Sequence, residues 1–488
     1  MSEDPKPTDL LAERRAKLQR LRDSGVEPFP HAFVGRTEIA IVREAHEGLE
    51  AGAETDDRVR IAGRIAARRG MGKASFLDLR DGTGQIQVQA RVDDLGEGYE
   101  GLLHLDIGDI VGIDGTVFAS RRGELSVRAE AWTLLSKSLR PPPDKFHGLE
   151  DVETRYRRRE LDLIANAETR ELFVKRARTI SAVRRWFDDR GFIEVETPVL
   201  QPLYGGALAR PFTTHHNALD RDLYLRIATE LYLKRLIVGG IEKVYELGKD
   251  FRNEGISHKH NPEFTMLEWY EAYADYSDVA RELEALVSEL AEQVNGSTRV
   301  ERGGETIDLA PPWRRLTLRD AIRDQTGIDV LEHRERDELA AQIGGELDPE
   351  AGWGKLVDDL LSKRVEPNLI EPTFVTDYPL ELSPFAKRHR SEHGLVERWE
   401  AFVGGMEISN AFSELNDPDD QRARFEAQAE EIARGDEEAA PYDEAYVEAL
   451  EQGMPPTAGA GLGIDRLVMI LTGAKTLREV VLFPAMRT

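Results

Sequence analysis

The sequence predicts an α+β protein, with a small all-β domain near the N-terminus and a larger mixed domain after it. Between residues 58 and 138, short alternating apolar and polar stretches are separated by glycine-containing turns, as in a small antiparallel barrel. Pro141-Pro142-Pro143 then marks a linker, because proline fits neither a helix interior nor a central strand. The chain has 488 residues, which is enough for two or three domains of roughly 100–200 residues each.

Five strands are expected in the all-β domain, with the sequences VRIAGRI, ASFLDLRD, QIQVQARV, DIVGIDGTVF and ELSVRAEAWTLL. Five strands in about 80 residues fit a Greek-key barrel of the oligonucleotide-binding type, and a fragment of a β-sandwich is the alternative. Residues 8–23, before the barrel, space their leucines helically with Arg and Lys between them. They predict a short basic amphipathic helix.

Helices and strands are both expected in the larger domain. The expected elements are a helix over 168–190 that ends at Gly191, a strand over 192–200, an antiparallel section over 223–273, mainly helices over 277–364, and strands at 373–378 and 399–415. No internal repeat is present in the sequence.

Composition excludes several classes of protein and of site. The chain contains no cysteine, which excludes disulfides, thiolate zinc sites and a cysteine nucleophile. No apolar run approaches the ~20 residues that span a bilayer, and the N-terminus lacks the basic and apolar regions of a secretory signal. We therefore expect a soluble cytoplasmic protein without a membrane partner.

Acidic residues dominate, and the formal net charge is −26. On its own this disfavours a polyanionic partner, because nucleic acids are bound largely through their phosphates. The charge is uneven, however, since residues 58–140 hold 13 Lys and Arg against 11 Asp and Glu. Basic runs of this kind are usually a solvated face, so charge alone does not identify a nucleic-acid surface.

The first segment with unusual chemistry is 244–273, where two strand-like stretches flank a polar loop. Each stretch places polar and aromatic residues on one face: Arg252 and Glu254 on the first, and Phe264, Met266, Glu268 and Tyr270 on the second. A carboxylate on such a face needs a partner, and a salt bridge from Glu268 to Arg252 is the simplest one. Arg252 also suits a bidentate grip on phosphate or carboxylate, and Phe264 would stack on a base.

The second segment is a predicted hairpin. If Gly404-Gly405 forms a two-residue turn, Glu400 and Glu407 lie diagonally on one face, roughly 7–8 Å apart at Cα. Two such carboxylates repel unless a cation lies between them, and oxygen ligands at this spacing suit Mg²⁺ held with phosphate oxygens. The alternative is that both point to solvent. Strict alternation places Asn410 on the opposite face, so we expect a bulge or a strand end before it.

The third segment is 457–471, where glycines at 459, 461 and 463 lead into an apolar helix with Arg466 in its first turn. Glycines allow a close backbone approach, and the positive end of a helix attracts phosphate. The spacing is neither GxGxxG nor a P-loop, so alone the segment is more typical of a tight turn than of a site.

Together and in this order, the three segments resemble the signature motifs of class II aminoacyl-tRNA synthetases. Motif one corresponds to residues 191–200, motif two to 251–264 and motif three to 459–467. The stretches QPLYGGALARPFTTHHN and LYLRIATELYLKRLIVGG are similar to the bacterial lysyl-tRNA synthetases in particular.

The resemblance implies four parts: an N-terminal helical extension (1–57), an anticodon-binding barrel (58–138), a linker (139–167) and a class II catalytic domain (168–488). The catalytic domain would contain a six-stranded, mostly antiparallel sheet, and motif one would build a homodimer. The implied reaction is ATP-dependent activation of L-lysine to lysyl-adenylate and transfer to the 3′ end of tRNA(Lys), with release of AMP and pyrophosphate.

The resemblance also implies roles for individual residues. Arg252 would hold the lysine carboxylate and the α-phosphate, and Arg466 would meet the γ-phosphate, which makes these two the expected catalytic residues. The implied ATP contacts are Arg252, Glu254, His260, Asn261, Phe264, Gly461 and Arg466, the lysine contacts are Gly206, Glu230, Glu268, Tyr270, Asn410 and Glu414, and the Mg²⁺ ligands are Glu400 and Glu407. Alignment and charge stabilisation would carry the first step without a general base, because the lysine α-carboxylate is already ionised at neutral pH.

Charge also argues for the amino acid. Lysine carries two ammonium groups, and the expected site offers several carboxylates beyond the metal pair. By the resemblance, Glu414 lies where an aspartate enzyme of the same subclass has arginine, which selects a cationic substrate. An aspartyl or asparaginyl enzyme is therefore disfavoured.

A paralogue that lysylates a protein and a non-catalytic RNA-binding relative would also share parts of this sequence pattern. The first resembles a catalytic domain alone, so the barrel argues against it. The second usually lacks motif residues, whereas Arg252, Glu407 and Arg466 are all present.

Phe76 is the expected stacking residue of the barrel, with Arg68 and Gln87 as further tRNA contacts. Barrels of this type stack bases on exposed aromatic rings and track phosphates with nearby cations. The alternative is that Phe76 belongs to the core, since a lone phenylalanine in a strand is usually buried.

Overall fold

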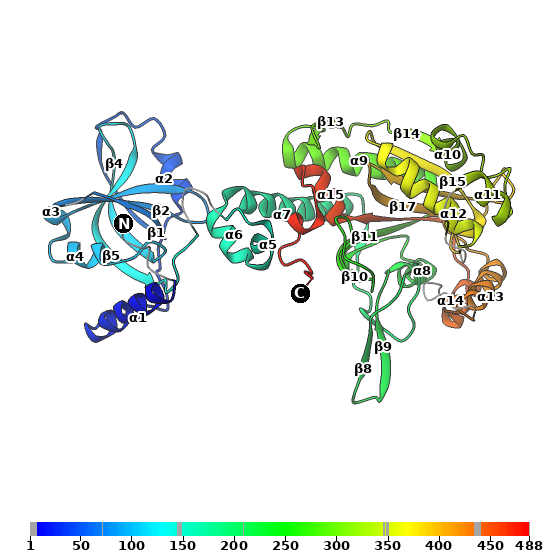
Figure 1. Cartoon of the computed structure of the whole chain (residues 1–488), viewed down its shortest axis with the longest axis horizontal. Helices are drawn as coiled ribbons and strands as arrows, with labels where there is room; N and C mark the ends of the chain where they lie inside the picture. The colour runs from blue at the N-terminus through cyan, green and yellow to red at the C-terminus, as the bar shows by residue number, and fades with distance from the viewer. Residues whose placement is uncertain are drawn as a thin grey trace. The chain divides into compact units, whose positions relative to one another are not determined.

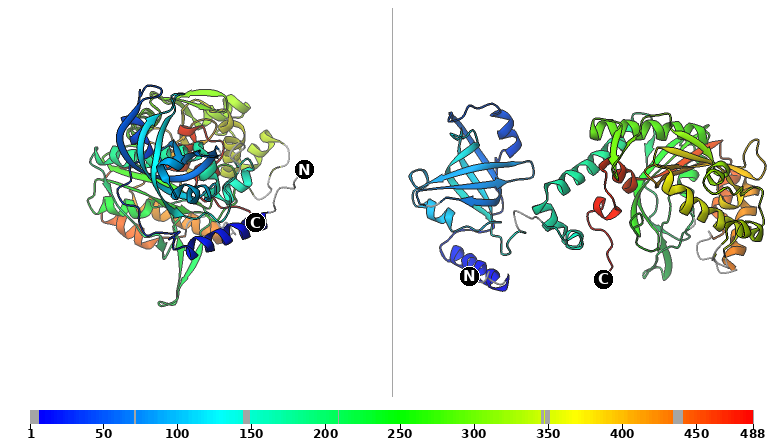
Figure 2. Two further views of the ribbon diagram at one scale, coloured as in Figure 1. Left: turned by 90° about the vertical axis from the view of Figure 1, so that its left-hand side faces the viewer. Right: turned by 45° about the horizontal axis from the view of Figure 1, so that its top comes forward.

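The computed structural model describes residues 7–70, 72–143, 149–207, 209–344, 347, 351–433 and 441–487. Contacts within the chain divide it into two compact units, Met1–Ala167 (unit 1) and Glu168–Thr488 (unit 2), which Figures 1 and 2 show. None of the helices in the described ranges combines the length and the apolar character needed to cross a membrane.

Unit 1 contains a closed five-stranded barrel with the strand order β1-β2-β3-β5-β4. The strands are β1 (Glu54–Arg69), β2 (Ala74–Arg80), β3 (Gln85–Arg91), β4 (Ile110–Ala119) and β5 (Leu125–Ser136). These are the five strands that the alternating pattern predicts, and closure of the barrel excludes a sandwich fragment. All five strands contribute apolar residues to one core, such as Ile61, Leu79 and Val88.

The helices of unit 1 are α1 (Pro7–Asp23), α2 (Ile39–Ala45), α3 (Val92–Leu95), α4 (Gly98–Leu103), α5 (Val152–Arg157) and α6 (Arg159–Ala165). The predicted basic helix is α1, and polar contacts fasten it to the segments that flank β4 and β5. The buried side chain of Arg14 donates to the carbonyl oxygens of Ile107 (3.1 Å) and Ser138 (3.0 Å). The ammonium of Lys17 lies 2.6 Å from a carboxylate oxygen of Asp106.

Unit 2 contains an eight-stranded sheet in the order β14-β15-β16-β17-β18-β11-β10-β6. The strands are β6 (Ile193–Glu194), β10 (Lys243–Phe251), β11 (Glu263–Ala272), β14 (Arg314–Thr317), β15 (Thr373–Pro379), β16 (Leu395–Phe402), β17 (Glu407–Ser413) and β18 (Thr457–Gly463). The six central strands are antiparallel neighbours, whereas β14 and β6 pair in parallel at the two edges. The expected six-stranded sheet is therefore the centre of a larger, eight-stranded one. The two edge strands were not predicted because they are short and carry no alternating pattern of their own.

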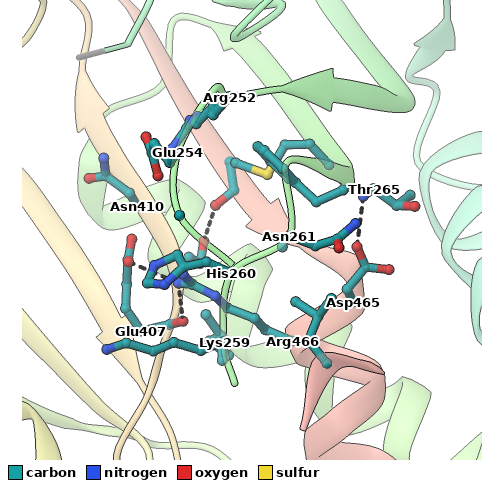
Figure 3. Close-up of a pocket in the computed structure, with 18 residues that line it drawn as sticks. Arg252, Glu254, Lys259, His260, Asn261, Thr265, Glu407, Asn410, Asp465 and Arg466 are labelled. Carbon is teal, nitrogen blue, oxygen red and sulfur yellow. Dashed lines mark hydrogen bonds and ion pairs between the residues drawn. The ribbon is translucent and has the colours of Figure 1, made fainter. Parts of the chain in front are cut away.

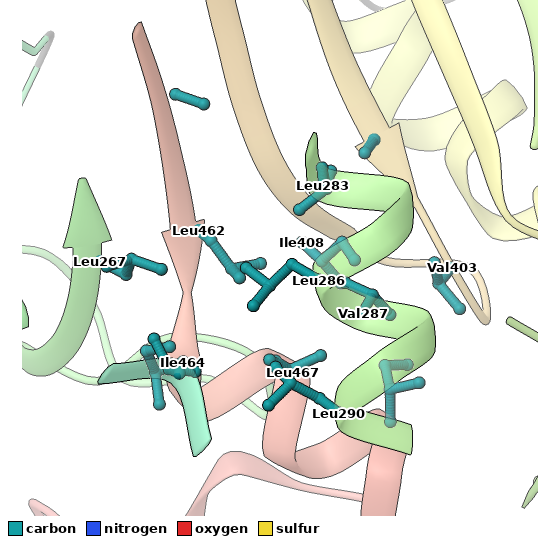
Figure 4. Packing of buried hydrophobic residues seen from close by; sticks show 14 of the residues in the cluster. Leu267, Leu283, Leu286, Val287, Leu290, Val403, Ile408, Leu462, Ile464 and Leu467 are labelled. Carbon is teal, nitrogen blue, oxygen red and sulfur yellow. The ribbon is translucent and has the colours of Figure 1, made fainter. Parts of the chain in front are cut away.

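The two faces of this sheet have different surroundings. On β11, Leu267 and Trp269 are fully buried in a core that also includes helices α9 (Tyr276–Asn295) and α15 (Ile464–Thr472). Figure 4 shows this packing, with Leu283, Leu286, Val287 and Leu290 of α9 close to Ile408, Leu462 and Leu467. Each fully buried side chain of this size contributes roughly 1.5–3 kcal/mol. One face thus stabilises the sheet, and the other is free to carry polar residues.

The remaining elements of unit 2 surround this sheet. They are α7 (Ala167–Asp188), α8 (Glu230–Val238), α10 (Leu318–Thr326), α11 (Arg336–Ile343), α12 (Trp353–Leu360), α13 (Pro418–Ala433), α14 (Glu444–Glu451), α16 (Leu477–Val480), the short helices η1 (Leu361–Val365), η2 (Glu366–Asn368) and η3 (Leu380–Leu382), the pair β12 (Arg299–Arg302) and β13 (Glu305–Asp308), and the sheet of β7 (Leu200–Gln201), β8 (Thr213–His216) and β9 (Arg221–Leu225). β8 and β9 form a ribbon that projects from the rest of unit 2 in Figures 1 and 2.

Two sequence predictions in unit 2 are wrong in detail. The strand expected over 192–200 is reduced to β6 and β7, and Pro198 between them cannot donate a ladder hydrogen bond. The antiparallel section expected over 223–273 is interrupted by α8. That helix buries Glu230 and Lys234, which are four residues apart and therefore lie on one helix face.

A buried ion pair in unit 1 leads to a first prediction. The Lys137 ammonium lies 2.9 Å from Asp109 and 2.6 Å from Asp106, and the side chains of Lys137 and Asp109 are 1% and 0% exposed. Lys137→Met would leave the buried carboxylate unpaired, which costs roughly 3–5 kcal/mol. We expect a clearly lower melting temperature for unit 1, measured by circular dichroism on the full chain.

The matched control is Arg58→Met, because Arg58 pairs with Glu130 on the surface at 79% exposure. An exposed pair of this kind contributes about 0–1 kcal/mol. Equal melting temperatures for the two variants would contradict the importance of the buried pair.

Candidate active site

Strand β18 forms the floor of the candidate active site. It lies between β17 and β11, and its alternate glycines at 459, 461 and 463 line the two cavities described next. The glycine spacing alone favours a tight turn here, and that interpretation is wrong because these residues form a strand. The helix expected after them is present as α15. A Cβ on Gly459 would lie 2.2 Å from the ring of Tyr270 and 2.3 Å from Oε1 of Glu414. Glycine is required because neighbouring side chains fold over the strand.

Two cavities that share lining residues open on this floor. The first, of about 160 Å³, is bounded by the β10–β11 connection and the start of α15. The second, of about 370 Å³, is bounded by the start of α8 and by residues 382–386. Their shared walls contain Arg252, Met266, Glu407, Asn410 and Gly461. A ligand in either cavity would therefore lie against these residues.

The β10–β11 connection supplies one wall of the first cavity. β10 ends at Phe251, so Arg252 and Glu254 lie beyond the strand and do not share a strand face as expected, although both line the cavity. The guanidinium of Arg252 lies 5.2 Å from the ring centroid of Phe264. Within the described part of the chain, no ion pair joins Arg252 to Glu268, so the simple salt-bridge interpretation does not hold.

His260 and Asn261 belong to the same connection and also line the first cavity (Figure 3). Burial, together with the positive charges of Arg466 and Lys259, lowers the pKa of His260 to about 4. The ring is therefore neutral at physiological pH, and its Nδ1 lies 2.8 Å from Oγ of Ser257. Asn261 is held at both ends of its amide, since Nδ2 donates to a backbone oxygen at 2.5 Å and Oδ1 accepts from a backbone nitrogen at 3.2 Å.

Arg466 reaches across the first cavity to Glu407 (Figure 3). Its Nη1 lies 3.0 Å from Oε2 of Glu407 and also donates to the Glu407 carbonyl oxygen at 2.7 Å. The preceding residue, Asp465, accepts from the backbone nitrogen of Thr265 at 2.8 Å and pairs with Arg176 of α7 at 2.6 Å. The start of α15 is thus anchored to β11 and α7, and this contact fixes the position of the Arg466 backbone.

The predicted hairpin is present between β16 and β17. The two glycines of its turn have φ values of 61° and 70°, as a two-residue turn of this kind requires. Phe402 pairs with Glu407, and the register shifts directly before Phe402. This shift is the expected bulge, and it brings Asn410 opposite Glu400. Glu400, Glu407 and Asn410 consequently line the same cavity.

Glu400 and Glu407 fit a divalent cation. Glu400 accepts from the Tyr378 hydroxyl at 2.8 Å and from the Arg398 guanidinium at 2.6 Å. Burial raises the pKa of Glu400 to about 7, the charge of Arg398 opposes this rise, and the neighbouring Glu407 adds to it. Two repelling carboxylates suit a hard cation such as Mg²⁺. No cluster of three or more His or acidic residues that could hold a metal occurs in the described ranges, so phosphate and water oxygens would have to complete the coordination.

The second cavity collects most of the residues expected around lysine. Gly206, Glu230, Glu268, Tyr270 and Asn410 line it. Glu268 accepts a weak hydrogen bond from the Tyr270 hydroxyl at 3.3 Å. Burial, with the charges of Asp250 and Glu230, raises the pKa of Glu268 to about 8. The cavity therefore holds carboxyl groups that a cation would return to the ionised form.

Glu414 differs from the other expected lysine contacts. Its side chain is fully buried beneath Gly459 and forms an ion pair with Lys234, an internal lysine of the protein. Lys234 and Arg398 are the charged residues of this region that the sequence analysis missed. Their spacing offered a signal, because Lys234 follows Glu230 by one helical turn and Arg398 precedes Glu400 on the same strand face.

The barrel of unit 1 has an open groove of its own. Phe76 is half-buried, lies outside the barrel core and lines this groove with Gln85, Gln87 and Arg69. Arg68 does not line it, since its guanidinium donates to the carbonyl oxygens of Leu103 and Leu105 instead. Successive residues of a strand point to opposite faces, so Arg69 takes the position that was expected for Arg68.

Comparison with known proteins agrees with this geometry. Residues 151–487 match the family model described as tRNA synthetases class II (D, K and N), and residues 59–135 match the OB-fold nucleic acid binding domain. A lysine–tRNA ligase of Pelotomaculum thermopropionicum is 54% identical over 98% of this chain and 95% of its own length. Lysine–tRNA ligases of Moorella thermoacetica and Staphylococcus aureus are 52% and 49% identical, with 98% of each chain covered. The chain therefore belongs to the lysine–tRNA ligase family of class II tRNA synthetases.

Proposed function

We propose that the protein activates L-lysine with ATP and transfers the lysyl group to tRNA(Lys). The observation that carries this proposal is the pair of cavities that share Arg252. ATP would occupy the first cavity and lysine the second, so the α-phosphate and the lysine carboxylate would meet at the shared wall. A guanidinium suits both anions, because its fork of donors matches phosphate and carboxylate alike.

The residues of the first cavity would bind and align ATP. Phe264 would stack on the adenine, and Glu254, His260, Asn261 and Gly461 would contact the nucleotide. Arg466 would exchange its bond with Glu407 for the γ-phosphate. An oxygen of the lysine carboxylate would attack the α-phosphorus while the bond to pyrophosphate breaks, and Arg252 would stabilise the charge on the α-phosphate. No general base is needed, since the attacking carboxylate is already ionised.

Glu400 and Glu407 would hold Mg²⁺ against the ATP phosphates. The ion supplies charge stabilisation for the departing pyrophosphate. Tyr378 and Arg398 would orient Glu400 for this contact, as their bonds of 2.8 and 2.6 Å to its carboxylate indicate. Mg²⁺ keeps several oxygen ligands from substrate and water, which matches a site with two protein carboxylates.

The second cavity would recognise lysine through its charge. The α-ammonium would meet Glu230 and the backbone of Gly206. The ε-ammonium would meet Glu414, Tyr270 and Glu268 at the far end. Buried carboxylates without a cation are costly, so the site favours a substrate that carries two positive charges.

We further propose a homodimer that forms through motif one, residues 191–200, and acts in the cytoplasm. Ile193, Val199 and Leu200 leave 53%, 40% and 47% of their surface exposed in this segment. Several exposed apolar residues close together in sequence are typical of a surface that a partner covers. The groove beside Phe76 would take the anticodon of tRNA, with bases stacked on the ring and phosphates near Arg121 and Arg122.

The decisive experiment for the reaction is ATP–pyrophosphate exchange with each of the twenty amino acids in turn. Lysine alone should support rapid exchange. Exchange with aspartate or asparagine instead, or with no amino acid, would contradict the proposal.

The metal ligands give a second prediction. Glu407→Ala removes one carboxylate from Mg²⁺, and the lost stabilisation of the leaving group costs several kcal/mol. We expect exchange to be abolished, while lysine still binds in isothermal titration calorimetry. Glu451→Ala is the control, because Glu451 is a surface residue of α14. Full exchange by Glu407→Ala would contradict the metal assignment.

The lysine pocket gives a third prediction. Glu414→Gln keeps the shape of the side chain but removes its charge, and a charge-assisted contact contributes ~1.5–3 kcal/mol. Lysine kcat/KM should therefore fall by roughly one to two orders of magnitude, with little change in the KM for ATP. Steady-state exchange at varied lysine and varied ATP measures both, and an unaltered lysine KM would disprove the assignment.

The barrel gives a fourth prediction. If bases stack on Phe76, Phe76→Ala should cost ~1–3 kcal/mol in tRNA charging and leave lysine-dependent exchange intact. Phe29→Ala is the matched control, because Phe29 is 41% exposed in unit 1 but does not line the groove. Equal losses in charging and exchange, or a lower melting temperature with normal charging, would show that Phe76 has a structural role instead.

A further inference from the structure

Lys234 of α8 is a charged residue buried within the substrate-binding side of unit 2. Its side chain is 0% exposed, and its ammonium contacts two carboxylates, Oε1 of Glu230 at 2.5 Å and Oε2 of Glu414. The rings of Phe412, Phe385 and Tyr270 surround it, with centroids 5.2, 5.4 and 6.0 Å from the nitrogen. One ammonium therefore bridges two residues that come from different parts of the chain.

The carboxylate of Glu414 is incompletely satisfied within the protein. Both of its oxygens are buried and have no hydrogen-bond partner among the described residues, although Oε2 contacts the Lys234 ammonium and Oε1 has no such ion pair. Oε1 lies against Gly459, where a Cβ would come within 2.3 Å of it, and Gly459 lines the second cavity. A buried carboxylate oxygen without a partner is costly, which indicates that a donor from the cavity completes it.

Charges in this cluster do not balance within the protein. The titratable and charged groups around the ammonium are Glu230 on α8, Asp250 on β10, Glu268 and Tyr270 on β11, Arg398 on β16, Glu414 after β17, and Tyr446 on α14. The acidic groups of this set are Glu230, Asp250, Glu268 and Glu414, and its cations are Lys234, which contacts two of them, and Arg398. A bound lysine would add two ammonium groups to this acidic cluster.

We propose that Lys234 is a positioning residue for lysine selection, which holds Glu230 and Glu414 in place as carboxylates and leaves Oε1 of Glu414 for the substrate ammonium. The inference rests on the proposed function, in which Glu230 and Glu414 meet the two ends of lysine. A single nitrogen that touches both carboxylates also limits how far apart they can move. Because the substrate spans the same two residues, this bridge would set the spacing that fits lysine.

A purely structural role explains the cluster less well. A buried ion pair is often no more stabilising than apolar residues of the same volume, so stability alone would not favour this arrangement. Burial raises the pKa of Glu414 well above its usual range, Lys234 opposes the rise, and Glu230 and Glu268 add to it. Burial also raises the pKa of Glu230, again opposed by Lys234. Lys234 thus favours the ionised form of both groups, which is the form that a cationic ligand needs.

The test is Lys234→Met in the full chain, which removes the charge and nearly keeps the length. Without the cation, the pKa values of Glu230 and Glu414 rise further, which favours the protonated form of both groups. The lysine KM should rise roughly tenfold or more at pH 7 and fall as the pH is raised from 6 to 8.5, which restores the carboxylates. Wild-type KM should change much less over this range, and the KM for ATP should stay within about twofold in the variant.

Lys243→Met is the matched control, because Lys243 is 38% exposed and pairs with Glu271 away from the cavities. It should leave the lysine KM and its pH profile unchanged. A Lys234→Met protein with wild-type lysine KM and pH profile would overturn the inference, as would equal increases in the KM values for lysine and ATP. If wild-type protein shows no lysine-dependent exchange, the proposed function fails instead. This result distinguishes failure of the proposed function from failure of the inference about Lys234.

If Lys234→Met does not fold, Lys234→Arg keeps the charge but changes its position. The lysine KM should then rise while its pH profile remains as flat as that of wild type. An unchanged lysine KM in folded Lys234→Arg would overturn the inference.

Discussion

The alternation of side chains across one antiparallel sheet is the constraint on which the rest of unit 2 depends. On β11, Leu267 and Trp269 pack into the core with α9, while Met266, Glu268 and Tyr270 face the cavities. A shift of one residue in register would turn the core residues toward the cavities and the cavity residues toward the core. The same register therefore determines both the core and the site. The bulge before Phe402 has the same consequence on β17, because it turns Asn410 to the side of Glu400.

Charge pairing within the site follows from this geometry. Arg466 bonds to Glu407, Arg398 to Glu400, and Lys234 to Glu230 and Glu414. Each of these four acidic groups, expected to meet a substrate or a metal, is thus held by a cation of the protein. Substrates would enter by exchange of partners, which avoids exposing unpaired charges in a buried site.

Local features of both units could be predicted from the sequence alone. Alternating patterns identified the five barrel strands and the hairpin at Gly404-Gly405, because strand periodicity and turn chemistry depend on neighbouring residues alone. Motif resemblance identified the residues that the two cavities collect, such as Arg252, Glu268 and Arg466. The family assignment follows from the same motifs.

The tertiary structure was needed to show which side chains meet across distant segments. The glycines of β18 looked like a turn because their neighbours, Tyr270 and Glu414, lie far away in sequence. The sequence does not distinguish Arg68 from Arg69, because only the closed barrel shows which face each side chain occupies. The contact of Lys234 with Glu414 joins residues 180 positions apart. Such long-range contacts depend on strand register and helix packing, which no local pattern encodes.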